Sequence, residues 1–80
     1  MDRKQAIKEL TLMLLYLTAQ PDRDYPQALP RSWKGYDFGV LNELSDDGCI
    51  VDGKRSKSVG ITEDGERQAK GLLLKYGITE

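Results

Sequence analysis

Hydrophobic residues near the N-terminus recur with the period of a helix. Ile7, Leu10, Leu14 and Leu17 are separated by three or four positions, and residues 2–19 contain neither glycine nor proline. One apolar stripe at this spacing is typical of an amphipathic helix that packs against a core. We therefore predict a helix over residues 2–19, with this stripe facing the core of the domain.

The same predicted helix carries apolar residues outside that stripe, and these point in other directions: Leu12, Met13, Leu15 and Tyr16. A helix that is apolar nearly all round must be buried on more than one side. In so short a chain the second cover is a second copy, which predicts a symmetric homodimer through these four residues. The alternative is that residues 25–29 fold back over them.

The middle of the chain predicts a loop and then a second helix. Residues 20–30 hold all three prolines, each of which removes an amide donor and biases the preceding residue away from a helix. Asp37 can cap the helix that follows, and Gly48 suits the left-handed position at which a helix ends. We therefore predict a helix over residues 37–47, with its apolar positions at Phe38, Val40, Leu41 and Leu44.

The hydrophobic period changes after Gly48. Two short β-prone runs, residues 49–51 and 58–61, are separated by a polar segment and predict a two-stranded hairpin. With a further helix near the C-terminus, the predicted order is helix, proline-rich loop, helix, two-stranded β-hairpin and helix. This order is an α+β fold that is mainly helical.

The last predicted helix has recognisable ends. Thr62 can cap its first turn, where Glu63 and Asp64 suit the positive end of the helix dipole. Gly77 is expected to end the helix in a Schellman cap, which places Ile78 in position for the hydrophobic contact of that motif. The apolar face of this helix is formed by Ala69, Leu72, Leu73 and Tyr76.

Composition limits the class of protein. The chain has 80 residues, 39% of them hydrophobic, and a formal net charge of −1, which fit a single domain over residues 1–80. Its longest unbroken apolar run, residues 12–17, is far shorter than the ~20 residues that span a bilayer. The charged N-terminus lacks the pattern of a signal peptide. We expect a cytoplasmic protein that does not contact a membrane.

Residues suited to catalysis or metal binding are scarce. The chain has no histidine and one cysteine, Cys49, which we expect to be buried and inert beside Ile50. The acidic residues Asp46, Asp47 and Asp52 lack the alternating spacing of a calcium loop, and no glycine-rich phosphate-binding motif occurs. We therefore predict that the protein is not an enzyme and has no cofactor, metal site or small-molecule substrate.

This sequence resembles two known families. From Phe38 to Tyr76, the predicted helix and hairpin, followed by ITEDG at residues 61–65, resemble the second half of a winged helix-turn-helix domain. With MDRKQAIKELTLMLLYL and SWKGYDF, the whole chain resembles a family of small uncharacterised bacterial proteins that is grouped as a domain of unknown function. The first resemblance implies a winged-helix-like fold and a regulatory role through binding of double-stranded DNA. The proline-rich loop stands where such domains have a further helix.

The same resemblance implies that residues 37–47 enter the major groove and that the hairpin tip contacts phosphate. The charges favour only the second contact. Residues 36–48 carry four acidic side chains and no basic one, whereas residues 49–61 carry three basic side chains against one acidic one. Asn42 is the candidate reader of a base edge on the helix. The predicted nucleic-acid contacts are Lys34, Asn42, Lys54, Arg55 and Lys57.

Aromatic residues beside this predicted site leave two interpretations open. Trp33, next to Arg31 and Lys34, can act as a platform on which a base stacks. Alternatively, Trp33 and Tyr36 cover the core, as the only tryptophan of a small domain generally does. Gly35 between them indicates a close approach of the backbone.

A second class of function fits the same sequence. A protein-interaction or dimerisation module of winged-helix shape would contact its partner through the acidic residues 37–47 or through the first helix, without binding DNA. The net charge near zero favours this alternative, and a polar hairpin tip can serve solubility alone.

Overall fold

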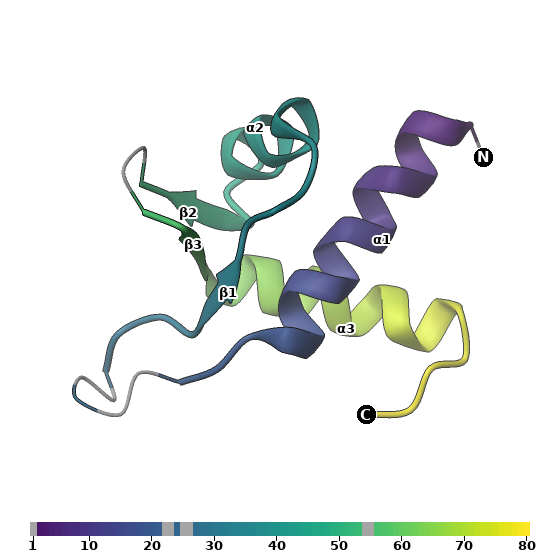
Figure 1. Ribbon diagram of the computed structural model, residues 1–80. Helices are drawn as coiled ribbons and strands as arrows, with labels where there is room; N and C mark the ends of the chain where they lie inside the picture. Colours follow the sequence, from purple (N-terminus) through teal and green to yellow (C-terminus); the bar gives the residue numbers. More distant parts are fainter. Residues whose placement is uncertain (1, 22–23, 25–26, 54–55) are drawn as a thin grey trace.

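The computed structural model describes residues 2–21, 24, 27–53 and 56–80. It is α+β and mainly helical, with three helices and a three-stranded antiparallel sheet (Figure 1). Within these residues, no helix is long and apolar enough to cross a membrane. In chain order the elements are α1 (Arg3–Thr18), β1 (Arg31–Trp33), α2 (Phe38–Asp46), β2 (Ile50–Asp52), β3 (Ser58–Ile61) and α3 (Glu63–Lys75).

Each helix begins after a side chain that accepts a hydrogen bond from the amide three residues later. These caps are Asp2 at 2.8 Å, Asp37 at 3.1 Å and Thr62 at 3.0 Å. A cap satisfies an amide that has no partner inside the helix and typically stabilises it by ~1 kcal/mol. The predicted caps at Asp37 and Thr62 are confirmed.

Helices α2 and α3 both end at a glycine with positive φ. Gly48 has a φ of 78° and Gly77 a φ of 69°. After α3, the Ile78 amide donates to the Leu73 carbonyl at 2.8 Å and the Gly77 amide donates to the Leu74 carbonyl at 3.2 Å. These two bonds define a Schellman motif, and α2 ends with the equivalent pair around Gly48. Both predicted helix ends are confirmed.

The sheet contains the predicted hairpin and one strand more. β3 lies between β1 and β2 and pairs antiparallel with both. The prediction of a two-stranded sheet is therefore incomplete, because β1 extends it and a bridge between Gln20 and Arg31 continues the pairing. β1 has three residues, and the one that is buried is the polar Ser32, so its sequence lacks the alternation of apolar and polar residues from which a strand can be predicted.

The buried face of α1 is the opposite of the predicted one. Leu12, Met13 and Leu15 are buried, and Tyr16 is partly buried against the core, where α1 packs on α3, α2 and β1. Leu12, Met13 and Leu15 therefore pack inside one chain and are not accessible to a second copy as predicted, and Tyr16 is accessible only in part. The stripe predicted to face the core is 42% to 54% exposed: Ile7, Leu10, Leu14 and Leu17. Both sets recur at helical spacing, so periodicity alone does not identify the buried set.

The segment considered as an alternative cover for α1 is described only in part. Leu29 lies against Gly60 of β3, where its Cβ would be 3.3 Å from a Cβ placed on that glycine. Tyr25 and Pro26 lie outside the described residues.

The core lies between the helices and the inner face of the sheet. Its most deeply buried side chains come from α1, from α2, from the position before β2 and from β3: Leu15, Leu41, Leu44, Cys49 and Val59. Tyr36 packs partly buried against this core, as predicted. Trp33 does not, and the interpretation of Trp33 as a cover for the core is wrong because it is 67% exposed. Phe38 also points to solvent instead of the core.

Candidate nucleic-acid interface

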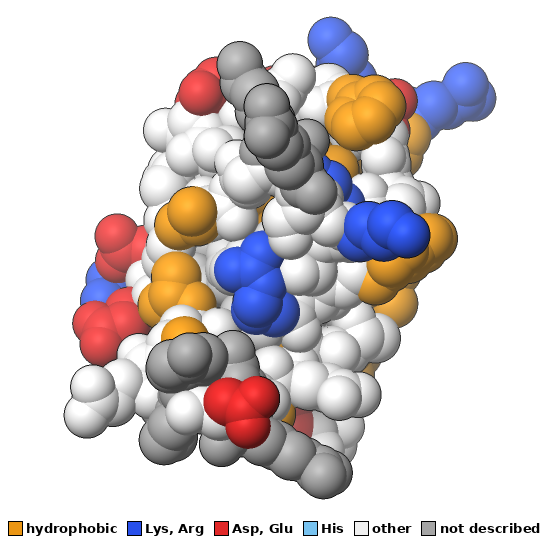
Figure 2. Space-filling model, turned by 60° about the vertical axis from the view of Figure 1, so that its left-hand side comes forward, with side chains coloured by type: hydrophobic (Ala, Val, Ile, Leu, Met, Phe, Trp, Pro, Cys, Tyr) orange, Lys and Arg blue, Asp and Glu red, His pale blue; other side chains and the backbone are white. Residues whose placement is uncertain are grey.

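The outer face of the sheet presents basic and aromatic side chains together. In the register of β1 and β3, Trp33 is paired with Ser58 and Arg31 with Gly60. Ser32 lies between them and is buried, so Arg31 and Trp33 point to the opposite side, where both are exposed. Figure 2 looks onto this side of the molecule and shows lysine and arginine side chains beside hydrophobic ones.

The Trp33 indole is exposed but held in position. Its ring lies over Gly35 so closely that a Cβ atom at Gly35 would come within 1.8 Å of the indole. The Tyr36 ring meets it edge to face, with ring centroids 6.1 Å apart. The close backbone approach that Gly35 indicates in the sequence is therefore confirmed. The indole rests on the chain and offers much of its surface to a ligand.

The Arg31 guanidinium is oriented by neutral groups. Its Nε donates to the Ser58 hydroxyl at 2.8 Å, and its Nη2 donates to the Ser56 hydroxyl at 3.0 Å and to the Ser58 carbonyl at 2.9 Å. Across the described residues, no carboxylate forms an ion pair with Arg31. Its positive charge is therefore held in place without an acidic partner among the described residues, which suits the binding of an anion.

Lys34 is bound differently. Its ammonium donates to Asp52 Oδ1 at 2.7 Å and to the Gly53 carbonyl at 3.0 Å, and the Lys34 and Asp52 side chains are only 15% and 19% exposed. Asp52 balances the charge, and the pair ties the segment after β1 to the end of β2. This geometry favours a structural role for Lys34 over its predicted contact with a nucleic acid.

The predicted hairpin cations are placed in part. Lys57 is exposed and immediately precedes Ser58, the residue paired with Trp33. Lys54 and Arg55 lie outside the described residues. Arg31 is not one of the five predicted contacts, although the sequence places it beside Trp33, where it can extend the basic surface. It joins the contacts because it stands two positions before Trp33 on the same strand. We call the set Arg31, Trp33 and Ser58 the Trp33 face, and Lys57 is the neighbour of Ser58 in the chain.

Asn42 lies apart from the Trp33 face. It is exposed on α2, and the exposed side chains that follow on this helix include Glu43 and Asp46. Asp47, just after α2, forms an ion pair with Lys8 of α1. The exposed side of α2 is therefore acidic, as the sequence indicates, and repels a phosphate backbone.

Cys49 is suited to packing and not to chemistry. It is buried, and this burial, followed by the nearby Asp47 carboxylate, raises the pKa of its thiol. A thiol that keeps its proton is a poor nucleophile and a poor metal ligand. Within the part of the chain that the structure describes, no three histidine, cysteine, aspartate or glutamate residues are grouped so as to hold a metal ion.

The chain is similar to proteins of unassigned function. The family described as Domain of unknown function (DUF6429) matches residues 3–79, which confirms the resemblance to such a family. The chain is 31% identical over 70 residues to the uncharacterized protein y4hR of Sinorhizobium fredii (strain NBRC 101917 / NGR234). This similarity covers 86% of the chain and 85% of that protein. No solved structure matches the chain significantly.

Proposed function

The chain belongs to the family DUF6429, whose description assigns no function, and from its own geometry we propose that it is a nucleic-acid-binding module. The observation that carries this proposal is Trp33, which is exposed, lies over Gly35 and stands on the same strand face as the Arg31 guanidinium, which neutral groups orient. In this proposal the ligand is single-stranded and lies on the Trp33 face. The fold is then winged-helix-like, with the β2–β3 hairpin as the wing.

Base stacking is the main contact in this proposal. Every base has an apolar π face, so an exposed indole binds single-stranded nucleic acid with little dependence on sequence. Because Gly35 and Tyr36 already hold the Trp33 ring, binding loses little side-chain freedom. Trp33 therefore supplies a prepared platform for one base.

Phosphate contacts complete the interface. A nucleic-acid backbone that passes the stacked base meets the Arg31 guanidinium, and Lys57, next to Ser58 in the chain, adds positive charge nearby. Lys54 and Arg55 precede Lys57 in the sequence and add charge at the hairpin tip. Each phosphate contact of this kind releases counterions, so the affinity is expected to fall as salt rises.

The alternative of a duplex held by α2 has less support. A helix in the major groove approaches phosphates on both sides, and the exposed residues of α2 include Glu43 and Asp46 but no cation. Lys34, a predicted contact, is already paired with Asp52. Both observations favour the sheet over the helix as the binding surface.

The test is a fluorescence titration with labelled single-stranded DNA and with a duplex of the same sequence, at two salt concentrations. An oligonucleotide of about 12 nucleotides is long enough for a small single-strand site. The protein has one tryptophan, so quenching of its emission reports directly on Trp33. We expect the single strand to bind more tightly than the duplex, to quench Trp33 and to weaken at the higher salt.

Two variants localise the contact. Trp33→Ala should lower the single-strand affinity about tenfold, since stacking of one base contributes ~1–3 kcal/mol. Arg67→Ala removes a cation from the exposed surface of α3 and is the matched control, which should change the affinity little. Absence of binding at low salt would overturn the proposal, and an equal effect of both variants would remove the Trp33 face from it.

A second candidate function, a protein-interaction module, is favoured by a different observation. That observation is the row of exposed apolar side chains on α1, an element outside the sheet.

A further inference from the structure

Four large aliphatic side chains form a row along the exposed side of α1. This helix runs from the N-terminus, at the upper right of Figure 1, to the middle of the view. We call Ile7, Leu10, Leu14 and Leu17 the α1 stripe. Single exposed apolar residues are ordinary on a protein surface, but a row of four on one helix is the kind of patch that marks an interaction site. It follows that the stripe is available to a partner.

We propose that the α1 stripe binds a second copy of this chain, with the two α1 helices antiparallel. Alternating spacings of three and four residues let two helices interlock side chains along a seam. In a pair centred between Leu10 and Leu14, Leu10 meets the partner's Leu14 and Ile7 meets the partner's Leu17. The same four residues are used twice about a two-fold axis, as in other symmetric dimers. This interface is independent of the proposed nucleic-acid contacts.

Charges at the two ends of α1 favour the antiparallel direction. Arg3 and Lys4 are exposed in the first turn, and neither forms an ion pair with another described residue. The other end of the helix lies beside Glu80, whose carboxylate accepts a hydrogen bond from the Tyr16 hydroxyl. An antiparallel pair brings each basic end to the partner's acidic end, whereas a parallel pair sets the two basic ends side by side.

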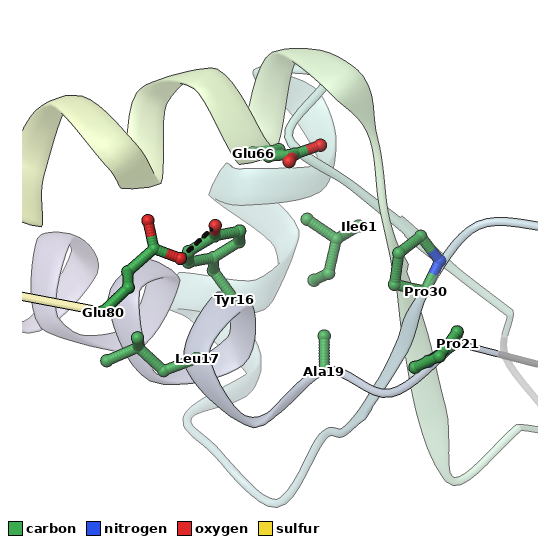
Figure 3. Close-up of a pocket in the computed structure, with 8 residues that line it drawn as sticks. All are labelled: Tyr16, Leu17, Ala19, Pro21, Pro30, Ile61, Glu66 and Glu80. Carbon is green, nitrogen blue, oxygen red and sulfur yellow. Dashed lines mark hydrogen bonds between the residues drawn. The ribbon is translucent and has the colours of Figure 1, made fainter.

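A hollow of about 430 Å³ lies at this acidic end. Leu17 and Pro21 belong to its apolar wall, and Glu66 and Glu80 also line it (Figure 3). In the antiparallel pair the partner's Lys4 stands opposite position 20, next to Pro21. Its aliphatic stem can then cover the apolar wall while its ammonium reaches Glu80. Glu66 already pairs with Lys70, which leaves Glu80 as the acceptor.

The size of this contact predicts a weak and reversible dimer. Helix α1 has 16 residues and is therefore about 24 Å long. The contact consists of one face of each α1 helix and one hollow at each end of the helix pair. It buries less than the ~800 Å² per partner of a standard interface. Association should consequently depend on concentration.

Sedimentation equilibrium of the full chain, at concentrations up to about 1 mM, tests the dimer directly. The wild type should shift from the mass of one chain to that of two. Leu10→Glu with Leu14→Glu should stay monomeric, while circular dichroism checks that it is folded. Leu74→Glu is the matched control, because Leu74 is 83% exposed on α3 and lies outside the α1 stripe. It should dimerise as the wild type does.

A charge exchange tests the direction of the helices. Lys4→Glu alone and Glu80→Lys alone should each weaken association several-fold, and the two together should restore it to within about twofold of wild type. Failure of the pair to restore it would overturn the antiparallel arrangement. A wild type that remains monomeric at the highest concentration, or a dimer that survives the double substitution of the stripe, would overturn the proposal altogether.

The stripe variant also separates this proposal from the proposed function. In dilute solution, Leu10→Glu with Leu14→Glu should bind single-stranded DNA as the wild type does, because the Trp33 face lies on the sheet. Loss of dimerisation with retained nucleic-acid binding therefore supports both proposals, and each can fail without the other.

Discussion

Trp33 lies across Gly35, with its indole ring in the space that a Cβ atom at Gly35 would occupy. Gly35→Ala must therefore displace the indole ring from its position over residue 35, while the tryptophan itself is retained. We expect this substitution to change the emission of Trp33 and to lower the affinity for single-stranded DNA by less than Trp33→Ala does. Fluorescence of the free protein and the titration described above measure both effects.

Gly71→Ala is the control for this prediction. Gly71 lies inside α3, and a Cβ atom there would meet nothing within 4 Å. Alanine is the better helix former, so the substitution should stabilise the fold by ~0.5–1 kcal/mol and leave nucleic-acid binding unchanged. An unchanged Trp33 emission in Gly35→Ala would contradict the idea that Gly35 holds the ring.

Adjacent leucines on α1 test which side of that helix forms the core. Leu15 is fully buried, so Leu15→Ala should lower the free energy of unfolding by ~2–5 kcal/mol. Leu14 belongs to the exposed stripe, and Leu14→Ala should cost less than ~1 kcal/mol in dilute solution. Urea denaturation measures the free energy of unfolding of both variants. Equal losses in the two variants would mean that the described packing of α1 is wrong.

Local chemistry explains which parts of this fold the sequence predicts correctly. The caps at Asp37 and Thr62 and the turns at Gly48 and Gly77 depend on residues within a few positions of one another, so each is visible in the sequence. The hairpin is likewise local. These features determine where four of the elements begin or end.

The incorrect predictions concern features that depend on distant parts of the chain. Both sides of α1 satisfy the helical period, and only the positions of α3 and the sheet decide that Leu15 and not Leu14 is buried. β1 exists because β3 offers it a partner. The exposure of Trp33 follows from β1, since the direction of its side chain is set by strand pairing. The candidate site was therefore located only in part.

The ion pair of Lys34 and Asp52 should contribute measurably to stability. Because both side chains are mostly buried, a double-mutant cycle with Lys34→Ala and Asp52→Ala is expected to give a coupling of about 1 kcal/mol. The exposed pair of Arg67 and Asp64 on α3 is the comparison and should give less than ~0.5 kcal/mol. A coupling near zero for the first pair would return Lys34 to the candidates for ligand binding.

Glu9 makes stability depend on pH. Hydrogen bonds from Gln5 and from the Tyr76 hydroxyl, together with the nearby Lys75 ammonium, lower the pKa of Glu9 from its usual 4.5. A carboxyl whose pKa is lower in the folded state adds stability above the unfolded value and loses it as the pH falls through the folded value. Acidification from pH 6 to 3 should therefore destabilise the wild type more than Glu9→Gln. Urea midpoints at the two pH values measure this, and identical losses would exclude Glu9 as a contributor.

The start of α3 explains the glycine in the ITEDG segment. Gly65 is buried, and a Cβ atom there would come within 2.0 Å of the Cys49 carbonyl oxygen. Thr62 closes the same junction, since its hydroxyl donates to the Gly48 carbonyl at 2.6 Å and its amide to the Cys49 carbonyl at 3.1 Å. Thr62 and Gly65 of the Thr-x-x-Gly pattern thus allow α3 to pack directly against the base of the hairpin. In this chain the pattern is accounted for by that joint, with no need of a ligand.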